Sequence, residues 1–480
     1  MLDVIIIGGG IMGVTAAKML SKYKLDVLLV EKNNDLGEGA SKSNSGVLYA
    51  GFHPRAKSLK GISCVKGNEM YKEICRELDV PVSYIGSLMV AFSDAGDEKI
   101  REKLQKGIAN GAKGLKIITG EEARALEPKL SSKVISALYS PSTAIVDVFK
   151  LVLHNARLAE ENGVLFKLNT EVKNIEKFEG FFSLKTTNGD FKAKFIINTA
   201  GENADKIESY FKPCEFVIKP RKGQYLIFEK ETAKKTINHV IYQAQDKDEK
   251  GCFISPTIDG NLIAGPTSED AKDYNDTKTT AQGLKKIEMV SKKIIPSLDM
   301  NKVITSFAGI RANIENVEKE KKDFVIRRTV KGMASALGIK NPGITSAPYL
   351  CKMLIQLLEE DGLALEKNPK AKDKLIITKN FFDCDEKTRI ELLKADADYS
   401  KVICTCEKVT LGDIKRVLCE PFPPTSLDGI KKRLRVGMGR CQGGFCTPEL
   451  VDILSDLWDV PRESILKASL KSNIIKGRVK

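Results

Sequence analysis

The sequence predicts an α/β protein with a nucleotide-binding unit at the N-terminus, an antiparallel sheet in the middle and a small cysteine-bearing module at the end. Three observations lead to this prediction. A glycine-rich turn lies between an apolar strand and a helix close to the N-terminus. Short segments of strand pattern, separated by turn residues, run from residue 216 to 267. Four cysteines near the C-terminus form a C-x-C pair and a C-x4-C pair.

The N-terminal segment predicts a complete strand, turn, helix and strand. Val4–Ile7 is an apolar run typical of a buried parallel strand. Gly8, Gly10 and Gly13 follow as G-x-G-x-x-G, which provides a tight turn, close approach of the backbone to a pyrophosphate and close helix packing. Glu31 ends the second strand, where its carboxylate would accept hydrogen bonds from a ribose hydroxyl. The segment therefore predicts a dinucleotide site at a helix N-terminus.

The composition describes a globular protein. Its 480 residues correspond to roughly three domains of about 150 residues each. Residues are 42% hydrophobic and 29% charged, and no other apolar run reaches the ~18 residues of a membrane span. The net charge of +14 favours anionic ligands, but scattered lysines without an aromatic stripe argue against nucleic acid. Eleven cysteines without a secretion signal indicate a reducing, cytoplasmic location.

A polar, glycine-rich loop, residues 37–51, follows the second strand and is expected to wrap the cofactor. The glycine motif followed by S-K-S-N-S-G-V-L-Y-A-G resembles the glycine/D-amino-acid oxidase superfamily of FAD enzymes. Within this superfamily, the chain resembles the anaerobic-type glycerol-3-phosphate dehydrogenases and the L-2-hydroxyglutarate oxidases. Those relatives carry N-S-x-V-x-H-A-G, with a histidine near the flavin, whereas this chain has Tyr49 there and His53 four residues later.

The resemblance implies a Rossmann-like FAD-binding domain interleaved with an antiparallel-sheet substrate domain. The strand ending at Ala200 resembles the second flavin-contacting turn, and ITSFAGIRA (304–312) and GIKNPGITSAPYL (338–350) match the dehydrogenase type. The helix after Pro342 would direct N–H groups at the flavin ring. Besides the three motif glycines, the expected FAD contacts are Glu31, Lys32, Ser41, Asn44, Ser45, Gly46, Val172, Ala200, Gly201, Gly309, Gly338, Gly343, Ile344 and Thr345.

The resemblance also implies four candidate catalytic residues. Arg311 would offer a planar fork to the substrate's anionic end. Lys250, in a K-G-x-x-x-x-P-T pattern, would stabilise alkoxide charge or act as the base. His53 and Tyr49 are the other candidate bases, and the high reference pKa of tyrosine disfavours Tyr49. His154, in a helix capped by Asp147, is expected to be structural.

The C-terminal module begins after a charged linker. Cys404 and Cys406 precede Cys441 and Cys446, and Gly443 in the second pair would let the backbone curl around inorganic sulfide. The stretch RVGMGRCQGGFC resembles the bacterioferritin-associated ferredoxin type of domain, which implies that these four cysteines bind a 2Fe-2S cluster. Structural zinc is the alternative, although zinc sites prefer two to four residues between paired cysteines. The module is expected to be small and helical.

The expected domain boundaries follow from these assignments. The FAD-binding domain is expected to comprise 1–84, 140–212 and 301–360, and the substrate domain 85–139 and 213–300. A linker would cover 361–398 and the 2Fe-2S domain 399–480.

A flavin accepts a hydride and a 2Fe-2S cluster passes single electrons, so the pairing implies dehydrogenation followed by electron export. The first expectation is oxidation of sn-glycerol 3-phosphate to dihydroxyacetone phosphate. The alternatives are a 2-hydroxy acid such as 2-hydroxyglutarate, an amine or amino acid, and an electron-transfer or iron-handling subunit without its own substrate. The acceptor would be a protein, oxygen or a quinone-linked partner subunit, so any membrane contact would be peripheral, at the inner face.

Overall fold

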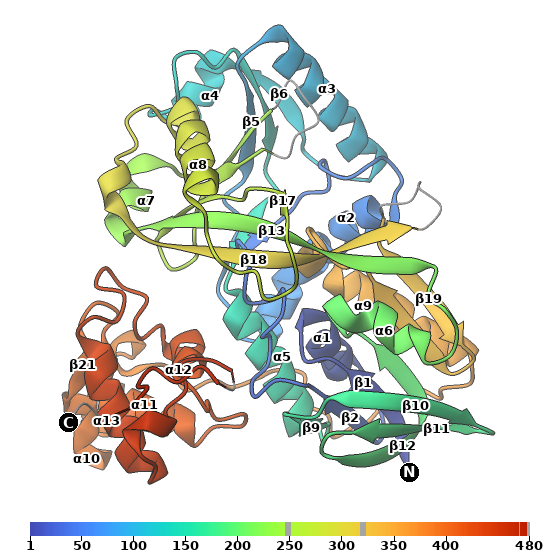
Figure 1. Ribbon diagram of the computed structural model, residues 1–480. Coiled ribbons are helices and arrows are strands. Elements are labelled where there is room, and N and C mark those ends of the chain that lie inside the picture. Colours follow the sequence, from blue (N-terminus) through green and yellow to red (C-terminus); the bar gives the residue numbers. More distant parts are fainter. Residues whose placement is uncertain (245–250, 317–322, 470, 478–480) are drawn as a thin grey trace. The chain divides into compact units, whose positions relative to one another are not determined.

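The structure is a computed structural model that describes residues 1–244, 251–316, 323–469 and 471–477 (Figure 1). It divides into two compact units. The first comprises Met1–Val30 and Gly37–Leu375, and the second comprises Glu31–Leu36 and Ile376–Lys480. The chain therefore passes between the units at three points.

A parallel sheet forms the centre of the first unit. Its strand β1 (Leu2–Ile7) pairs with β2 (Val27–Val30) on one side and with β12 (Gly189–Asn198) on the other. The apolar run in β1 is fully buried, as expected for a strand covered on both faces. The parallel strands follow in the order β9 (Leu165–Lys167), β2, β1, β12 and β20 (Met333–Leu337). This arrangement confirms the predicted Rossmann-like sheet.

Antiparallel strands extend this sheet. A meander of β10 (Val172–Phe178) and β11 (Phe181–Thr186) runs into β12, and β19 (Val325–Val330) pairs with β20. Val172, one of the expected FAD contacts, packs here among apolar core side chains.

Helices pack against the parallel sheet and against one another. Helix α1 (Ile11–Leu20) contacts α5 (Val148–Glu161) and α9 (Gly343–Glu360), and α9 contacts α2 (Leu59–Glu77). Asp147 caps α5 as predicted, by accepting the N–H of Lys150 at 3.0 Å.

A second, mostly antiparallel sheet forms the rest of the first unit. The long strands β13 (Phe216–Phe228) and β18 (Val303–Asn316) pair along most of their length and cross the unit together (Figure 1). From its edge, the sheet continues in the order β17 (Glu269–Asp270), β13, β16 (Leu262–Gly265), β15 (Phe253–Pro256), β14 (Val240–Gln243), β5 (Ser87–Ala91), β7 (Ser136–Ser140) and β6 (Lys116–Thr119). The predicted turn at residues 259–261 joins β15 to β16 as a hairpin.

One pairing in this sheet was not foreseen from the strand patterns. β14 pairs with β5 in parallel, which joins the segment before residue 92 to the segment after residue 239. A parallel pair needs a long crossover, and the intervening chain supplies it. The sheet thereby holds together the two separate stretches that were assigned to the substrate domain.

Shorter elements complete the first unit. A small sheet contains β3 (Val47–Leu48), β8 (Ala144–Val146) and β4 (Val82–Ser83). The remaining helices are α3 (Asp94–Ala109), α4 (Gly120–Leu126), α6 (Ala204–Ser209), α7 (Lys230–Thr236) and α8 (Ala281–Ile294). Of these, α3 contacts β5 and β7, and α8 contacts β13 to β16.

The second unit is small and mainly helical, as predicted. It contains β21 (Val402–Cys404), β22 (Val409–Thr410), α10 (Glu386–Ala395), α11 (Leu411–Leu418), α12 (Leu427–Leu434) and α13 (Cys446–Trp458). Ile414, Ile430 and Leu454 are fully buried in its core. The expected linker, 361–398, includes α10, and the domain boundaries stay predictions. Across the described residues, no helix is both long and apolar enough to cross a membrane.

Candidate functional site

The glycine turn after β1 leaves no room for a side chain at Gly8 or at Gly13. Gly8 has φ +105°, and a Cβ there would lie 2.6 Å from the carbonyl oxygen of Thr199. A Cβ on Gly13 would lie 1.9 Å from the carbonyl oxygen of Gly8. The Gly10 residue that precedes α1 provides no side-chain cap, and the first turn of α1 carries no acidic residue. This helix N-terminus therefore suits a phosphate group.

The loop after β2 meets the start of α1. The N–H of Ile11 donates to Ser41 Oγ at 3.0 Å, and the N–H of Gly46 donates to Asn44 Oδ1 at 2.6 Å. Gly46 has φ +69°, which favours glycine. These bonds fix the loop containing Ser41, Asn44, Ser45 and Gly46 beside the glycine turn.

A second turn lies at the same end of the sheet. Thr199 Oγ1 donates to the carbonyl oxygen of Ile7 at 2.9 Å, which brings the end of β12 beside the glycine turn. Ala200 and Gly201 follow, and Gly201 has φ +57°. Adjacent turns at the carboxyl ends of neighbouring parallel strands are the usual place for a ligand in this kind of sheet.

The acid at the end of β2 belongs to the second unit. Glu31 is buried, and its Oε1 accepts the backbone N–H of Asn33 at 2.9 Å and the Asn33 side-chain amide at 2.7 Å. Lys32 is exposed. The two hydrogen bonds from Asn33 therefore hold the Glu31 carboxylate in a defined orientation.

The N-terminus of α9 meets the same loop region. The helix begins at Gly343, as predicted, without a side-chain cap. Thr345 Oγ1 accepts the backbone N–H of Tyr49 at 3.0 Å. Gly309 on β18 approaches the loop closely, since a Cβ there would lie 2.5 Å from Ser43 Cβ. Gly338, with φ +67°, precedes the helix. The N–H groups of Ile344 and its neighbours are thus presented next to Tyr49.

An aromatic cluster surrounds His53. Its ring lies 4.2 Å from Phe52, 4.6 Å from Tyr242 and 5.4 Å from Tyr49, measured between centroids. His53 Nε2 is closed off from solvent without a hydrogen-bond partner among the described residues, and the neighbouring Tyr242 hydroxyl interacts with the Tyr49 side chain. The buried His53 Nε2 is therefore available to accept a hydrogen bond from a polar group.

Burial sets the protonation states in this cluster. Burial, together with the charge of Lys103, lowers the pKa of His53 to about 3, so its imidazole is neutral at pH 7. Burial raises the pKa of Tyr49, although hydrogen bonds with Asn341 and Ser45 oppose the shift. Tyr49 therefore keeps its proton at neutral pH.

Arg311 on β18 is held in a fixed position at the edge of this cluster. Its Nη1 donates to the carbonyl oxygen of Lys222 at 3.2 Å, and its Nη2 donates to that of Thr267 at 3.1 Å. The guanidinium lies over Gly223, where a Cβ would be only 2.1 Å from Nη2. The Tyr225 hydroxyl is a further hydrogen-bond partner. Arg311 also influences Tyr49 electrostatically, which places both predicted residues in one site.

The sequence did not single out Tyr225, Tyr242 or Asn341. The two tyrosines lie on β13 and β14, whose strand patterns were recognised, but alternation alone does not tell which side chains face a ligand. Lys250 lies outside the described residues, so its role stays a prediction. His154 has a structural environment, because its Nδ1 is 2.7 Å from the carbonyl oxygen of Leu78. Burial lowers the pKa of His154 to about 4.

Four of the cysteines in the second unit form two neighbouring pairs. Cys406 Sγ lies 3.9 Å from Cys441 Sγ, and Cys446 interacts directly with Cys404. Within the described residues, no group of three or more His, Cys, Asp or Glu side chains is arranged around a single metal ion. In a 2Fe-2S cluster with four thiolate ligands each iron takes two of them, and two adjacent pairs fit that donor set.

The loop between the paired cysteines provides backbone donors. N–H groups of Phe445, Gly443 and Gly444 point at Cys441 and lower its pKa. Gly443 has φ +86°, which favours glycine, and a Cβ on Gly439 would lie 2.2 Å from Cys406 Cβ. The backbone is therefore curled around the sulfur atoms, as a thiolate-bound cluster requires.

Two family models match the chain. One, described as FAD dependent oxidoreductase, matches residues 3–357. The other, described as BFD-like [2Fe-2S] binding domain, matches residues 402–456. The first range contains the glycine turn and the aromatic cluster, and the second contains all four paired cysteines.

One curated relative extends the match to the full length, and others cover about three quarters of the chain. A glycerol 3-phosphate dehydrogenase of Caloramator mitchellensis is 36% identical over 100% of this chain and 99% of its own. A glycerol 3-phosphate oxidase of Mycoplasma pneumoniae is 32% identical over 74% of this chain and 94% of its own. An L-2-hydroxyglutarate dehydrogenase of Arabidopsis thaliana is 25% identical over 72% of this chain and 81% of its own.

Solved structures agree with this assignment. The FAD-bound, dithionite-reduced L-alpha-glycerophosphate oxidase of Mycoplasma pneumoniae has a TM-score of 0.73 and 31% identity, covering 79% of this chain and 99% of that one. A glycine oxidase of Geobacillus kaustophilus shares the fold, with a TM-score of 0.66 over 78% of this chain and 99% of that one, at 21% identity. The chain therefore belongs to the FAD dependent oxidoreductases, with FAD as its redox cofactor and a C-terminal BFD-like domain that binds a [2Fe-2S] cluster.

Proposed function

We propose that this oxidoreductase is a dehydrogenase that oxidises sn-glycerol 3-phosphate to dihydroxyacetone phosphate. The observation that carries the proposal is the anchored guanidinium of Arg311 beside the aromatic cluster. It is supported by the full-length similarity of this chain to a glycerol 3-phosphate dehydrogenase. A guanidinium has five N–H donors, more than the carbonyl oxygens and Tyr225 use, so the remaining donors can bind a phosphate.

The FAD contacts are proposed on the same basis. The N-terminus of α1 would receive the pyrophosphate, the loop with Ser41, Asn44, Ser45 and Gly46 would follow it, and Glu31 would accept from the ribose. The turn at Ala200 and Gly201, together with the α9 N-terminus, would line the flavin. The tight spaces at Gly8, Gly13 and Gly309 support this arrangement, because each excludes a side chain. Lys32, Val172 and Gly338 are retained as proposed contacts from the resemblance alone.

Bound FAD would supply the hydride acceptor for the substrate carbon, and a side chain of the protein would then have to take the hydroxyl proton. Burial raises the pKa of Tyr49, so this residue keeps its proton at neutral pH and cannot take the proton of the substrate. His53 is neutral and its Nε2 has no described partner, so we assign it as the base. The low pKa of His53 makes its charged form costly, and a bound phosphate dianion nearby would reduce that cost.

Electron export is assigned to the second unit. Cys406 is exposed, and the neighbouring Phe445 is 87% exposed, so an acceptor can approach the cluster thiolates closely. The acceptor is proposed to be a protein or a quinone-linked partner, because a cluster delivers electrons singly.

Anaerobic mixing with candidate substrates tests the assignment. Glycerol 3-phosphate should bleach the flavin band near 450 nm (about the usual position for oxidised flavin) within one turnover. Bleaching by 2-hydroxyglutarate instead would support the second candidate, which the hydroxyglutarate dehydrogenase relatives favour because an arginine fork also fits a carboxylate. Bleaching by no alcohol or amine would support an electron-transfer subunit.

Substitutions test the base. His53→Gln should lower the rate of flavin reduction at least tenfold while FAD stays bound. Tyr49→His places a histidine where the similar families carry one, and it should leave the rate nearly unchanged if His53 is the base. A large rise in rate for Tyr49→His would contradict the assignment of His53.

A further inference from the structure

The second unit contains a short piece of the nucleotide-binding region. The chain leaves the first unit after Val30, at the end of β2, and returns to it at Gly37. The intervening segment, Glu31–Leu36, packs with the C-terminal module and belongs to the same compact unit. This segment starts with the acid proposed for the FAD ribose. The loop that carries Glu31 is therefore built together with the cysteine-bearing module.

A buried ion cluster holds this segment. Both oxygens of Asp35 accept from Arg433, at 2.9 and 3.0 Å, and Lys432 Nζ lies 2.8 Å from Asp35 Oδ2. All three side chains are at most 7% exposed. Burial alone would raise the pKa of Asp35, but the two cations more than offset it, and the pKa is lowered. Asp35 is thus a buried charged group whose two cationic partners among the described residues lie on α12.

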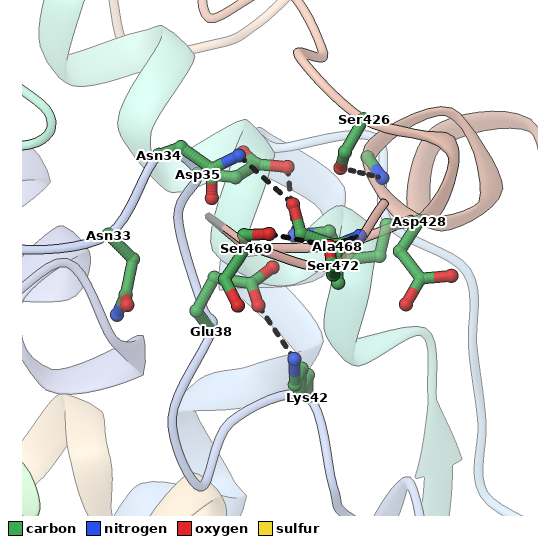
Figure 2. A network of polar contacts seen from close by, with 12 residues as sticks. Asn33, Asn34, Asp35, Glu38, Lys42, Ser426, Asp428, Ala468, Ser469 and Ser472 are labelled. Carbon is green, nitrogen blue, oxygen red and sulfur yellow. Dashed lines mark hydrogen bonds and ion pairs between the residues drawn. The ribbon is translucent and has the colours of Figure 1, made fainter. Parts of the chain in front are cut away.

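Neighbouring residues are fixed to the same module. Asn34 Nδ2 donates to Thr425 Oγ1 at 2.9 Å and to the carbonyl oxygen of Ala468 at 3.1 Å. Figure 2 shows Asn34 and Asp35 beside the turn of Ala468, whose N–H donates to Ser472 Oγ at 2.9 Å. The segment is therefore held at consecutive positions rather than at a single contact.

This attachment reaches Glu31 through the loop itself. Asn33 holds the Glu31 carboxylate with its backbone N–H and its side-chain amide, and it immediately precedes the anchored Asn34 and Asp35. Any movement of the anchored pair changes the position of both Asn33 donors. The direction of the Glu31 carboxylate therefore depends on contacts made by the C-terminal module.

We propose that Asp35, through its contacts with Lys432 and Arg433, is a positioning residue that holds the Glu31 carboxylate in the orientation in which it accepts from the adenosine 2′-hydroxyl of FAD. The inference rests on the proposed role of Glu31 and not on the identity of the substrate. The inference has a specific consequence: a substitution of Asp35 should weaken the recognition of the adenosine 2′-hydroxyl and leave the other FAD contacts unchanged.

A comparison of two cofactors tests this directly. FAD and its analogue lacking the adenosine 2′-hydroxyl are titrated into the full-length apoprotein. A hydrogen bond to a charged group is worth roughly a factor of ten to a hundred in affinity, so the wild-type chain should bind FAD tighter than the analogue by about that factor. Asp35→Asn should reduce this preference to less than about threefold, with little change in the affinity for the analogue.

Matched variants separate positioning from loss of structure. Asp428→Asn removes an exposed ion pair with Lys467 in the same module and should keep the full preference for FAD. Iron and sulfide content, with the visible spectrum of the cluster, reports whether the module is folded in each variant. If Asp35→Asn does not fold, Asn34→Ala removes two hydrogen bonds instead of an ion pair and should give a smaller loss of the same kind.

The contrary outcomes are also specific. If Asp35→Asn weakens FAD and the analogue equally, or weakens neither, Asp35 does not act through Glu31 and the inference is overturned. Glu31→Gln should abolish the preference, and an unchanged preference in that variant would equally overturn it. Neither result depends on substrate oxidation, so failure here leaves the proposed glycerol 3-phosphate activity unaffected.

Discussion

Burial decides what His53 can do at neutral pH. Its ring is packed among Phe52, Tyr49 and Tyr242, and its Nε2 meets no described partner. The sequence placed His53 near the cofactor loop. It also showed that Tyr49, four residues earlier, occupies the position where similar families carry a histidine. It could not tell that the imidazole is buried and stays neutral, because the burial involves Tyr242 of β14, which lies far away in the chain.

This neutral imidazole should make the protein acid-sensitive. The pKa of His53 is about 3 in the folded chain and about 6.5 in an unfolded one, so the unfolded state binds the extra proton first as the pH falls. The associated stability is complete above pH 6.5 and is lost toward pH 3, by about 2 kcal/mol at pH 5. When the pH is lowered from 7 to 5, the melting temperature of the wild-type chain should therefore fall more than that of His53→Gln. Equal falls would contradict this prediction.

Gly223 controls the position of Arg311. A methyl group at this position would enter the space of the guanidinium, and Arg311 would lose its carbonyl partners on Lys222 and Thr267. Gly223→Ala should raise KM for glycerol 3-phosphate at least tenfold and leave FAD content unchanged. Glycerol, which lacks the anionic group, serves as the control substrate, and its kcat/KM should stay the same. A parallel loss for both substrates would show a general disturbance of the site instead.

At the scale of elements, the crossing of α2 and α9 sets the position of the helix N-terminus assigned to the flavin. A Cβ on Gly67 in α2 would lie 1.9 Å from the carbonyl oxygen of Thr345 in the first turn of α9. The two helices can approach this closely only because Gly67 has no side chain. The hydrogen bond from the Tyr49 N–H to Thr345 Oγ1 depends on the same approach.

Gly67→Ala should push the two helices apart. Overpacking of this kind costs typically about 1–3 kcal/mol, and here it also moves the α9 N-terminus. The expected result is a lower melting temperature and a lower FAD content after purification, measured by absorbance. Gly39→Ala is the control. Gly39 lies in the loop of residues 37–51, and a Cβ at this position would meet nothing within 4 Å. Equal FAD content in the two variants would contradict the assigned role of α9.

Elements with local signals could be predicted from the sequence. The apolar run, the glycine spacing and the acid define β1, α1 and β2, and the proline before Gly343 marks the start of α9. Pairings between distant segments could not be predicted in this way. The parallel β14–β5 pair and the packing of Gly67 on Thr345 join residues that are more than 140 positions apart, and no local pattern records such contacts. Tyr225 and Tyr242 were missed for the same reason.

At the scale of the whole molecule, two redox groups of different capacity share one chain. FAD takes up two electrons and a 2Fe-2S cluster takes up one, so a complete chain should accept about three. The cysteine pairs that hold the cluster lie entirely in the second unit, and the glycine turn and the aromatic cluster lie in the first. Loss of the cluster should therefore change electron capacity without changing substrate oxidation.

Cys441→Ser tests this division of roles. The substitution removes a thiolate that receives backbone N–H groups from its own loop, and the variant should lose its iron. Anaerobic titration with glycerol 3-phosphate should then end at about two electrons per chain instead of about three, while the rate of flavin bleaching stays within about twofold of wild type. Cys419→Ser changes an exposed cysteine of the same module outside the two pairs and should retain about three electrons and the iron. A Cys441→Ser chain that still takes up three electrons would place the third electron elsewhere, and a wild-type chain that takes up only two would show that the substrate's electrons do not reach the cluster.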